Sequence, residues 1–404
     1  MALNLREIYV DLHENPELAF QEYRTAAIVA DHLEQLGYEV HTEIGQTGVA
    51  GILANGDGPV VLLRADMDGL PVHEETGLDY ASKARAIDRD GNDVPVMHAC
   101  GHDVHVTALL GAAEQLAETT DEWSGTVVLV FQPAEEAGGG AQAMVDDGLF
   151  EIVPKPDIVL GQHVAPLPAG MVAVHPGVAM AAADSIDITL YGVGGHGSRP
   201  ETTVDPVLMA ASLTLRLQQI VSREIAFTEQ AVVTVGQIHA GTKNNIIPST
   251  AKLGLSIRTL DADLRERVLG AIERITNAEA EAFGAPKPPT IHNTESFPLT
   301  YNDPESTERF TEALGEVLGT QRVIGAGVIS GSEDVGVLAT AAQVPLVYWF
   351  LGGGDPALFA GVTHESGLSS DIPSNHSPHF APVIEPTLST GVLALVSAAR
   401  EWLD

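Results

Sequence analysis

The stretch TVVLVFQPAEE, residues 126–136, decides the fold class, because an apolar run ends there in two adjacent carboxylates. A second stretch, PVVLLRADMD at residues 59–68, has the same form. Runs that are apolar on both faces are typical of strands in the middle of a sheet covered by helices. Chemistry in such sheets gathers where the strands end. We therefore expect an α/β fold with a covered, mixed sheet and a site at the carboxyl ends of its strands.

The surrounding chain predicts two domains, one inserted into the other. Strands are expected at residues 48–54 and 156–164, and helices at about 4–36 and 106–118. Residues 184–293 follow the order β-α-β-β-α-β, which is the ferredoxin-like split arrangement. After residue 293 the chain returns to the alternation of apolar strands and helices seen before residue 184, with an apolar strand at 344–350 and a helix at 386–403. We expect one discontinuous domain of residues 1–183 and 294–404, with 184–293 inserted.

Composition excludes several classes of protein. The 404 residues hold 20 Lys+Arg against 55 Asp+Glu, a formal charge of −35. Such a surface repels phosphate backbones and anionic lipid, so we expect no nucleic-acid or membrane partner. One cysteine leaves no internal disulfide. No export signal and no apolar run near ~20 residues is visible, so a cytoplasmic location is expected.

The stretch HACGHDVH, residues 98–105, concentrates groups that bind metals. By itself it leaves two interpretations open: a metal site, or capping and core packing by the same side chains. Three further elements favour the metal site: the Glu135–Glu136 pair, His163 in GQHV and His376 in NHSPHF. A thiolate, imidazoles and a carboxylate together suit zinc and its neighbours. Five candidate ligands exceed one tetrahedral catalytic zinc, which indicates two metal ions.

Eight motifs in order carry a resemblance to a known family. They are MHACGHDVHV, QPAEEAGGGA, GQHV, GGHGSRPETTVDPV, NNIIP, SIRTLD, SGSEDVGVLA and NHSPHF. The chain resembles the amidohydrolase branch of the dinuclear-metal aminoacylase and carboxypeptidase family. That branch includes hippurate hydrolases, N-acyl-amino-acid amidohydrolases and indole-acetyl-amino-acid hydrolases.

The resemblance implies a role for each matching residue of the metal centre. Cys100 bridges two divalent ions, foremost Zn²⁺, with Mn²⁺, Co²⁺ and Ni²⁺ as alternatives. Their coordination is completed by His102, Glu136, His163 and His376. Glu135 is implied as the general base that takes a proton from the attacking water and delivers it to the leaving amine. Asp68 and Asp103 are expected to orient ligands.

The resemblance also assigns the inserted domain the part of a lid and dimerisation domain. It implies that His196 reaches the active site of the partner subunit in a homodimer and polarises the scissile carbonyl. Asn245 and Arg258 are implied to hold the carboxylate of the substrate. Gly353 is expected to add a backbone amide.

These expectations favour hydrolysis of N-acyl or N-aroyl amino acids to a carboxylic acid and a free amino acid. A dipeptidase or carboxypeptidase on the same scaffold stays open, since the sequence does not decide which surface faces a free amine. Two other classes compete: a metal-binding scaffold protein without catalysis, and single-metal chemistry with Cys100 as nucleophile. Glu135 disfavours the scaffold, because a structural site needs no second carboxylate beside Glu136.

Overall fold

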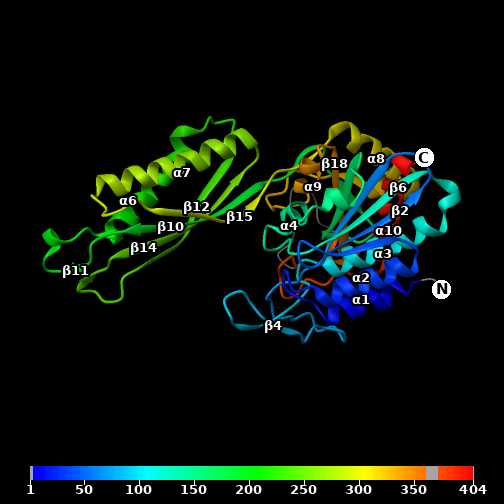
Figure 1. Ribbon diagram of the computed structural model, residues 1–404, viewed down its shortest axis with the longest axis horizontal. Coiled ribbons are helices and arrows are strands. Elements are labelled where there is room, and N and C mark those ends of the chain that lie inside the picture. The colour runs from blue at the N-terminus through cyan, green and yellow to red at the C-terminus, as the bar shows by residue number, and fades with distance from the viewer. Residues whose placement is uncertain (1–2, 361–371, 404) are drawn as a thin grey trace. The chain divides into compact units, whose positions relative to one another are not determined.

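The structure is a computed structural model that describes residues 3–360 and 372–403 (Figure 1). The chain divides into two compact units, which are described separately. The first unit comprises Met1–Ala179, Tyr301–Val328 and Asp334–Asp404, and the second Met180–Thr300 and Ile329–Glu333.

The first unit is built on an eight-stranded mixed sheet in the order β1-β2-β6-β3-β7-β18-β8-β17. Its four central strands β6, β3, β7 and β18 run parallel. The strands buried at its centre include the two apolar runs that predicted a covered sheet, so the expected mixed α/β fold is confirmed. The bounds are β1 Glu39–Ile44, β2 Gly48–Asn55, β3 Val60–Asp66, β6 Gly125–Gln132, β7 Ile158–Pro168, β8 Val172–Val174, β17 Val323–Gly325 and β18 Leu346–Gly354.

Helices pack against this sheet, and α3 and α10 also contact each other (Figure 1). Helix α3 is buried along most of its length, which explains why its sequence is apolar nearly all round. The helix bounds are α1 Leu5–Glu14, α2 Tyr23–Gln35, α3 His102–Glu118, α4 Gly140–Asp146, α5 Leu149–Ile152, α8 Pro304–Leu318, α9 Gly336–Ala342 and α10 Ile384–Leu403. A short hairpin, β4 Arg85–Ile87 with β5 Asp93–Pro95, precedes α3.

The single helical stretch expected over residues 4–36 is wrong in its middle. The structure has two helices there, α1 and α2, separated by residues 15–22. The segment begins with Asn15 and Pro16, and Pro disfavours helical backbone in the residue before it. The interruption brings Glu17 and Glu22 out of regular helix and frees both side chains for other contacts.

The second unit follows the order β10, α6, β12, β14, α7, β15 along the chain. Its antiparallel sheet has the strand order β12-β14-β10-β15. Strand β10 spans Ala182–Tyr191, α6 Pro206–Gln219, β12 Ala231–Ala240, β14 Thr250–Thr259, α7 Ala262–Ala282 and β15 Thr290–Phe297. A separate core joins the sheet to both helices. A two-stranded ribbon, β11 Gly195–His196 with β13 Ile246–Ile247, completes the unit.

Two short strands, β9 Gly177–Met180 and β16 Thr300–Asn302, lie along the chain where one unit gives way to the other. Among the described residues, no helix has the length and apolarity required to cross a membrane.

Candidate metal centre

Three neighbouring parallel strands end at one edge of the first unit's sheet and carry the acidic and imidazole side chains there. Strand β3 lies between β6 and β7, with Asp66 opposite Gln132 and Arg64 opposite Gly161. The turn after β6 therefore sets Glu135 and Glu136 beside the end of β3, and His163 lies two residues beyond Gly161 on β7. The topology alone gathers these groups, as expected for parallel strands.

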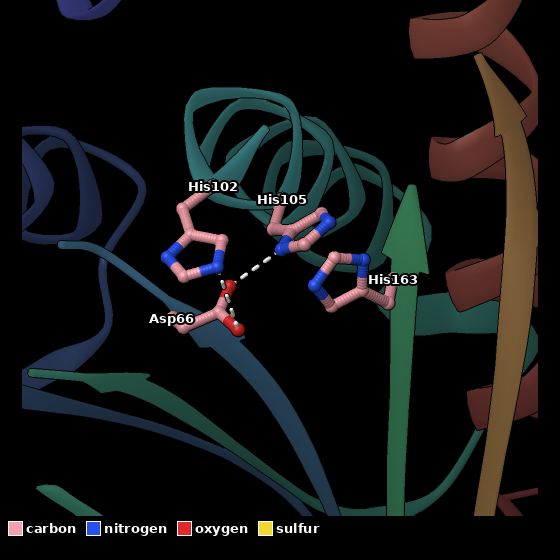
Figure 2. Close-up of side chains that lie close together, drawn as sticks. All are labelled: Asp66, His102, His105 and His163. Atoms are coloured by element: carbon pink, nitrogen blue, oxygen red, sulfur yellow. Dashed lines mark hydrogen bonds and ion pairs between the residues drawn. The ribbon is translucent and has the colours of Figure 1, made fainter. Parts of the chain in front are cut away.

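The amino-terminal end of α3 supplies the remaining groups. Gly101 precedes the helix with φ +83°, a backbone conformation that favours glycine. A Cβ at this position would lie 2.4 Å from Val164 Cγ1, so only glycine fits against β7. This close approach places Cys100 and His102 against the strand ends, and Figure 2 shows His102 and His105 of α3 facing Asp66 and His163.

The structure brings the five expected ligands into one cluster. Cys100 Sγ lies 3.4 Å from His163 Nε2. Glu136 Oε1 lies 3.9 Å from His102 Nε2 and 3.1 Å from His376 Nε2. Ligand atoms of Cys100, His102 and Glu136 all fall within 4.8 Å of one another. His376, from the carboxyl-terminal part of the chain, is tied to the cluster through its backbone N–H, which donates to Ala99 O at 2.8 Å.

Two histidines turn a ring nitrogen toward this cluster. His163 Nδ1 donates to Val164 O at 2.8 Å, so Nε2 carries the lone pair that faces Cys100. Burial holds the pKa of His163 well below its usual range, which keeps the ring neutral. His102 Nδ1 donates to Asp68 Oδ1 at 3.2 Å, while its Nε2 is buried without a hydrogen-bond partner. A neutral imidazole with one nitrogen anchored is the form that binds metal.

The charges around these ligands favour a cation. Burial opposes a charge on His102, but Asp66 and Asp68 outweigh burial and raise its pKa to about 10, so this position attracts positive charge and a metal ion bound at Nε2 would displace the proton there. Burial also raises the pKa of Cys100 well above its usual range, and the charges of Glu136 and Glu135 add to the effect. A thiolate at this position therefore requires a cation within bonding distance. The orphaned nitrogen of His102, the thiol and the excess of carboxylates fit divalent metal binding.

Asp68 holds both the ligand His102 and the turn after β6. Its Oδ1 accepts from His102 Nδ1 and from Glu135 N at 3.1 Å, and its Oδ2 accepts from Glu136 N at 3.0 Å. The side chain is fully buried, and burial raises its pKa. One carboxylate thus sets the orientation of an imidazole and of two consecutive backbone amides.

Asp66 and His105 join the cluster, although neither was assigned a site role from the sequence. Val164 N donates to His105 Nε2 at 2.7 Å, so His105 Nδ1 carries the proton and donates to Asp66 Oδ1 at 2.5 Å. Both ring nitrogens are thereby used inside the protein, and His105 orients Asp66 (Figure 2). The signal available in the sequence was its spacing of three from His102, which puts both rings on one helix face.

A buried arginine, Arg64, forms an ion pair with Asp66. Arg64 Nη1 donates to Asp66 Oδ2 at 2.7 Å, and its Nε donates to Gln132 Oε1 at 2.9 Å. Burial alone would raise the pKa of Asp66, but Arg64 and the two α3 histidines hold it well below its usual range. Asp66 therefore remains ionised beside the ligands.

Asp103 does not do what the sequence predicted for it. Its Oδ2 bonds His13 Nδ1 at 2.6 Å and its Oδ1 accepts from Val104 N, its own helix backbone. Among the described residues, none of its hydrogen bonds reaches an expected ligand. Asp103 bonds to His13 of α1 instead, and no local pattern in the sequence connects these two residues, which lie 90 positions apart.

The remaining expected residues lie elsewhere. Gly353 sits near the carboxyl end of β18, and its carbonyl accepts from Val383 N at 2.8 Å. In the second unit, His196 pairs with Ile246 in the β11–β13 ribbon and Asn245 directly precedes β13, where Gly197 N donates to Asn245 O at 2.9 Å. Arg258 on β14 donates to Ser332 Oγ at 2.9 Å. A cavity of about 480 Å³ opens beside the ribbon, lined in part by Gly197, Lys243 and Asn244.

A family model described as peptidase family M20/M25/M40 matches residues 62–374, from Leu62 in strand β3 to a point two residues before His376. The chain belongs to this family. The resemblance inferred from the eight motifs is therefore confirmed.

Two curated relatives and one solved structure illustrate the match. The "Thermostable carboxypeptidase 2" of Saccharolobus solfataricus is 37% identical over 388 residues, 95% of this chain and 91% of the relative. The "Hippurate hydrolase" of Campylobacter jejuni is 41% identical over 328 residues, 80% of this chain and 82% of the relative. The YXEP protein of Bacillus subtilis, described as a dinuclear metal binding peptidase, superposes with a TM-score of 0.75 at 28% identity, covering 99% and 97% of the two chains.

Proposed function

We propose that the chain is a metal-dependent amidohydrolase that cleaves N-acyl or N-aroyl amino acids into a carboxylic acid and a free amino acid. The observation that carries the proposal is the pair Glu135–Glu136 on one turn: Glu136 faces His102 and His376, and the adjacent, buried Glu135 adds a second carboxylate of the kind that acid–base chemistry requires. The hippurate hydrolase among the relatives bears a name that fits this substrate class.

The residues that would hold two divalent ions are Cys100, His102, Glu136, His163 and His376. A thiol, three imidazoles and a carboxylate favour zinc, and manganese, cobalt and nickel accept most of the same donors. When bound, such ions lower the pKa of water toward ~7 and polarise a carbonyl.

The chain's own groups supply the proton transfers. Glu135 takes the proton of the attacking water as the C–O bond forms at the amide carbon. It then delivers that proton to the nitrogen as the C–N bond breaks, so acid and amine leave with their atoms balanced. Asp68 keeps Glu135 in place through the backbone N–H at 3.1 Å. Arg258 and Asn245 receive the carboxylate of the amino acid, which a chain of charge −35 otherwise repels.

The second unit is proposed to be a ferredoxin-like lid and dimerisation domain. Its order along the chain and the strand order β12-β14-β10-β15 support that description. Strand β12 ends the sheet with Val232 and Ile238 exposed, and α6 exposes Leu208 and Leu215. An open sheet edge beside an apolar helix face supports pairing with a second copy through a two-fold contact. His196 is proposed to serve the partner's site, and a cytoplasmic location remains a prediction.

One alternative has a specific observation in its favour. The carboxypeptidase name of a relative 37% identical to the chain supports cleavage of peptides on the same scaffold. The two functions differ in the group that precedes the scissile amide, an acyl group or a peptide bearing a free amine.

A substrate panel separates them. Wild-type protein would be assayed with N-acetyl, N-benzoyl and long-chain acyl amino acids, dipeptides and longer peptides, in zinc, manganese or cobalt. Glu135→Gln is the matched control for contaminating hydrolases. The proposal expects acyl amino acids to have the highest kcat/KM, and a tenfold or greater preference for peptides would establish the alternative.

A further inference from the structure

Two buried carboxylates, Glu22 and Asp68, hold the backbone of the turn that follows β6. Three consecutive N–H groups donate to them: Ala134 N to Glu22 Oε1 at 2.8 Å, Glu135 N to Asp68 Oδ1 at 3.1 Å and Glu136 N to Asp68 Oδ2 at 3.0 Å. Asp68 was expected near the site. Glu22 comes from the segment between α1 and α2, 112 residues away from Ala134 along the chain.

Ala134 needs such support. Its φ of +50° lies in the left-handed region, which costs a residue other than glycine on the order of 1 kcal/mol or more. Backbone of this kind persists only where its surroundings determine it. The residue immediately after it is the general base Glu135, so the direction of the Glu135 side chain depends on this peptide.

Glu22 is completely buried, and its hydrogen bonds tie together three segments of the first unit. Its Oε1 also accepts from Phe20 N at 2.9 Å, and its Oε2 accepts from Thr47 Oγ1 at 2.5 Å. A buried carboxylate is costly unless donors satisfy it. Here the donors come from the break between α1 and α2, from the turn before β2 and from the turn that carries Glu135.

We infer that Glu22 is a positioning residue for catalysis: it holds the Ala134 peptide in its left-handed conformation and thereby aims Glu135. The inference rests on the proposed function, in which Glu135 moves the proton. Among the described residues, the hydrogen bonds of the Glu22 side chain reach no expected metal ligand. A displacement of the base by about 1 Å lowers turnover as much as 10²-fold without weakening substrate binding.

The chain offers a conservative variant and a matched control. In Glu22→Gln the amide oxygen can still accept from Ala134 N and Phe20 N, and its NH₂ can donate to Thr47 Oγ1. Glu17 is a carboxylate of the same segment that accepts from Arg24 N and Thr25 N in α2 and makes no hydrogen bond to the turn. Glu17→Ala therefore removes support from α2 but leaves Ala134 held.

The experiment compares full-length wild-type protein with Glu22→Ala, Glu22→Gln and Glu17→Ala, all reconstituted with zinc. Glu22→Ala should lower kcat about 10- to 100-fold with KM changed less than about threefold and metal content unchanged. Glu22→Gln and Glu17→Ala should stay within about threefold of wild-type kcat. Amide hydrogen exchange over residues 133–140 should become about 10- to 100-fold faster in Glu22→Ala alone.

The hydrogen-exchange and activity measurements distinguish failure of the inference about Glu22 from failure of the proposed function. Unchanged exchange at residues 133–140 in Glu22→Ala overturns the inference, as does an equal loss of kcat in Glu17→Ala. Wild-type protein that cleaves no acyl amino acid refutes the proposed function, while the exchange result still decides whether Glu22 holds the turn. If Glu22→Ala does not fold, Glu22→Asp keeps the charge but withdraws the carboxylate by about 1.5 Å, and the same exchange measurement applies.

Discussion

Replacing His13 with glutamine should remove a buried cation whose contribution to stability disappears in alkaline solution. The His13 side chain is 1% exposed, with Nδ1 2.6 Å from Asp103 Oδ2 and Nε2 3.1 Å from Glu74 Oε1. Burial opposes its charge, but the hydrogen bonds to Asp103 and Glu74 outweigh burial and raise its pKa from 6.5 to about 10. That difference corresponds to roughly 5 kcal/mol of folding free energy as an upper estimate.

The sign follows from the direction of the shift. Because the folded-state pKa of His13 exceeds the unfolded-state value, its contribution is complete below about pH 6.5 and is lost as the pH rises through about 10. At neutral pH, His13→Gln leaves Asp103 and Glu74 buried without a cation, a loss of roughly 3–5 kcal/mol. The free-energy gap between wild-type and variant protein should shrink toward zero by about pH 10.

Urea unfolding followed by tryptophan fluorescence measures this gap. The three tryptophans, Trp123, Trp349 and Trp402, all belong to the first unit, as does His13. Urea unfolding curves are recorded at a series of pH values from 6.5 to 10 on chelator-treated protein, so that metal binding does not contribute to the measured stability. His41→Gln is the control, because the His41–Glu39 pair lies at the surface and contributes about 1 kcal/mol or less. A gap that stays constant over this pH range would refute a charged His13.

Four further outcomes are expected. Glu135→Gln should keep its metals but lose turnover by about two to four orders of magnitude, and metal loss from Glu135→Gln with full activity in Glu136→Gln would reverse the two assignments. Elemental analysis should find two divalent ions per chain after reconstitution, and chelation should abolish activity; one ion or fewer contradicts the two-metal centre. Gly101→Ala should lower metal content, because its Cβ would meet Val164 at 2.4 Å, and wild-type metal content would contradict that packing. Inactive His196→Ala mixed with inactive Glu135→Gln should recover about a quarter of wild-type activity, since half of the randomly paired dimers carry one working site; heterodimers without activity would show that His196 does not serve the partner.

Local patterns predicted most of the regular structure. The strands expected at residues 48–54, 156–164 and 344–350 correspond to β2, β7 and β18, and the helices expected at 106–118 and 386–403 correspond to α3 and α10. The error over residues 4–36 arose because α1 and α2 are both amphipathic, so one helical period runs through the sequence on either side of Pro16. Pro16 indicates a helix boundary, but the helical periodicity of the residues on both sides of it favoured one continuous helix.

The sequence by itself determined the kinds of ligand, because a thiol, imidazoles and paired carboxylates that follow apolar strands are together typical of a metal site. It could not determine their partners. Arg64 with Asp66 could be suspected from their nearness in the chain, but Glu22 with Ala134, His13 with Asp103 and His105 with Val164 are separated by 112, 90 and 59 residues. No periodicity records such pairs. Only the packing of α1, α2 and α3 against the strand ends decides which buried carboxylate meets which donor, because each must be satisfied where water is excluded.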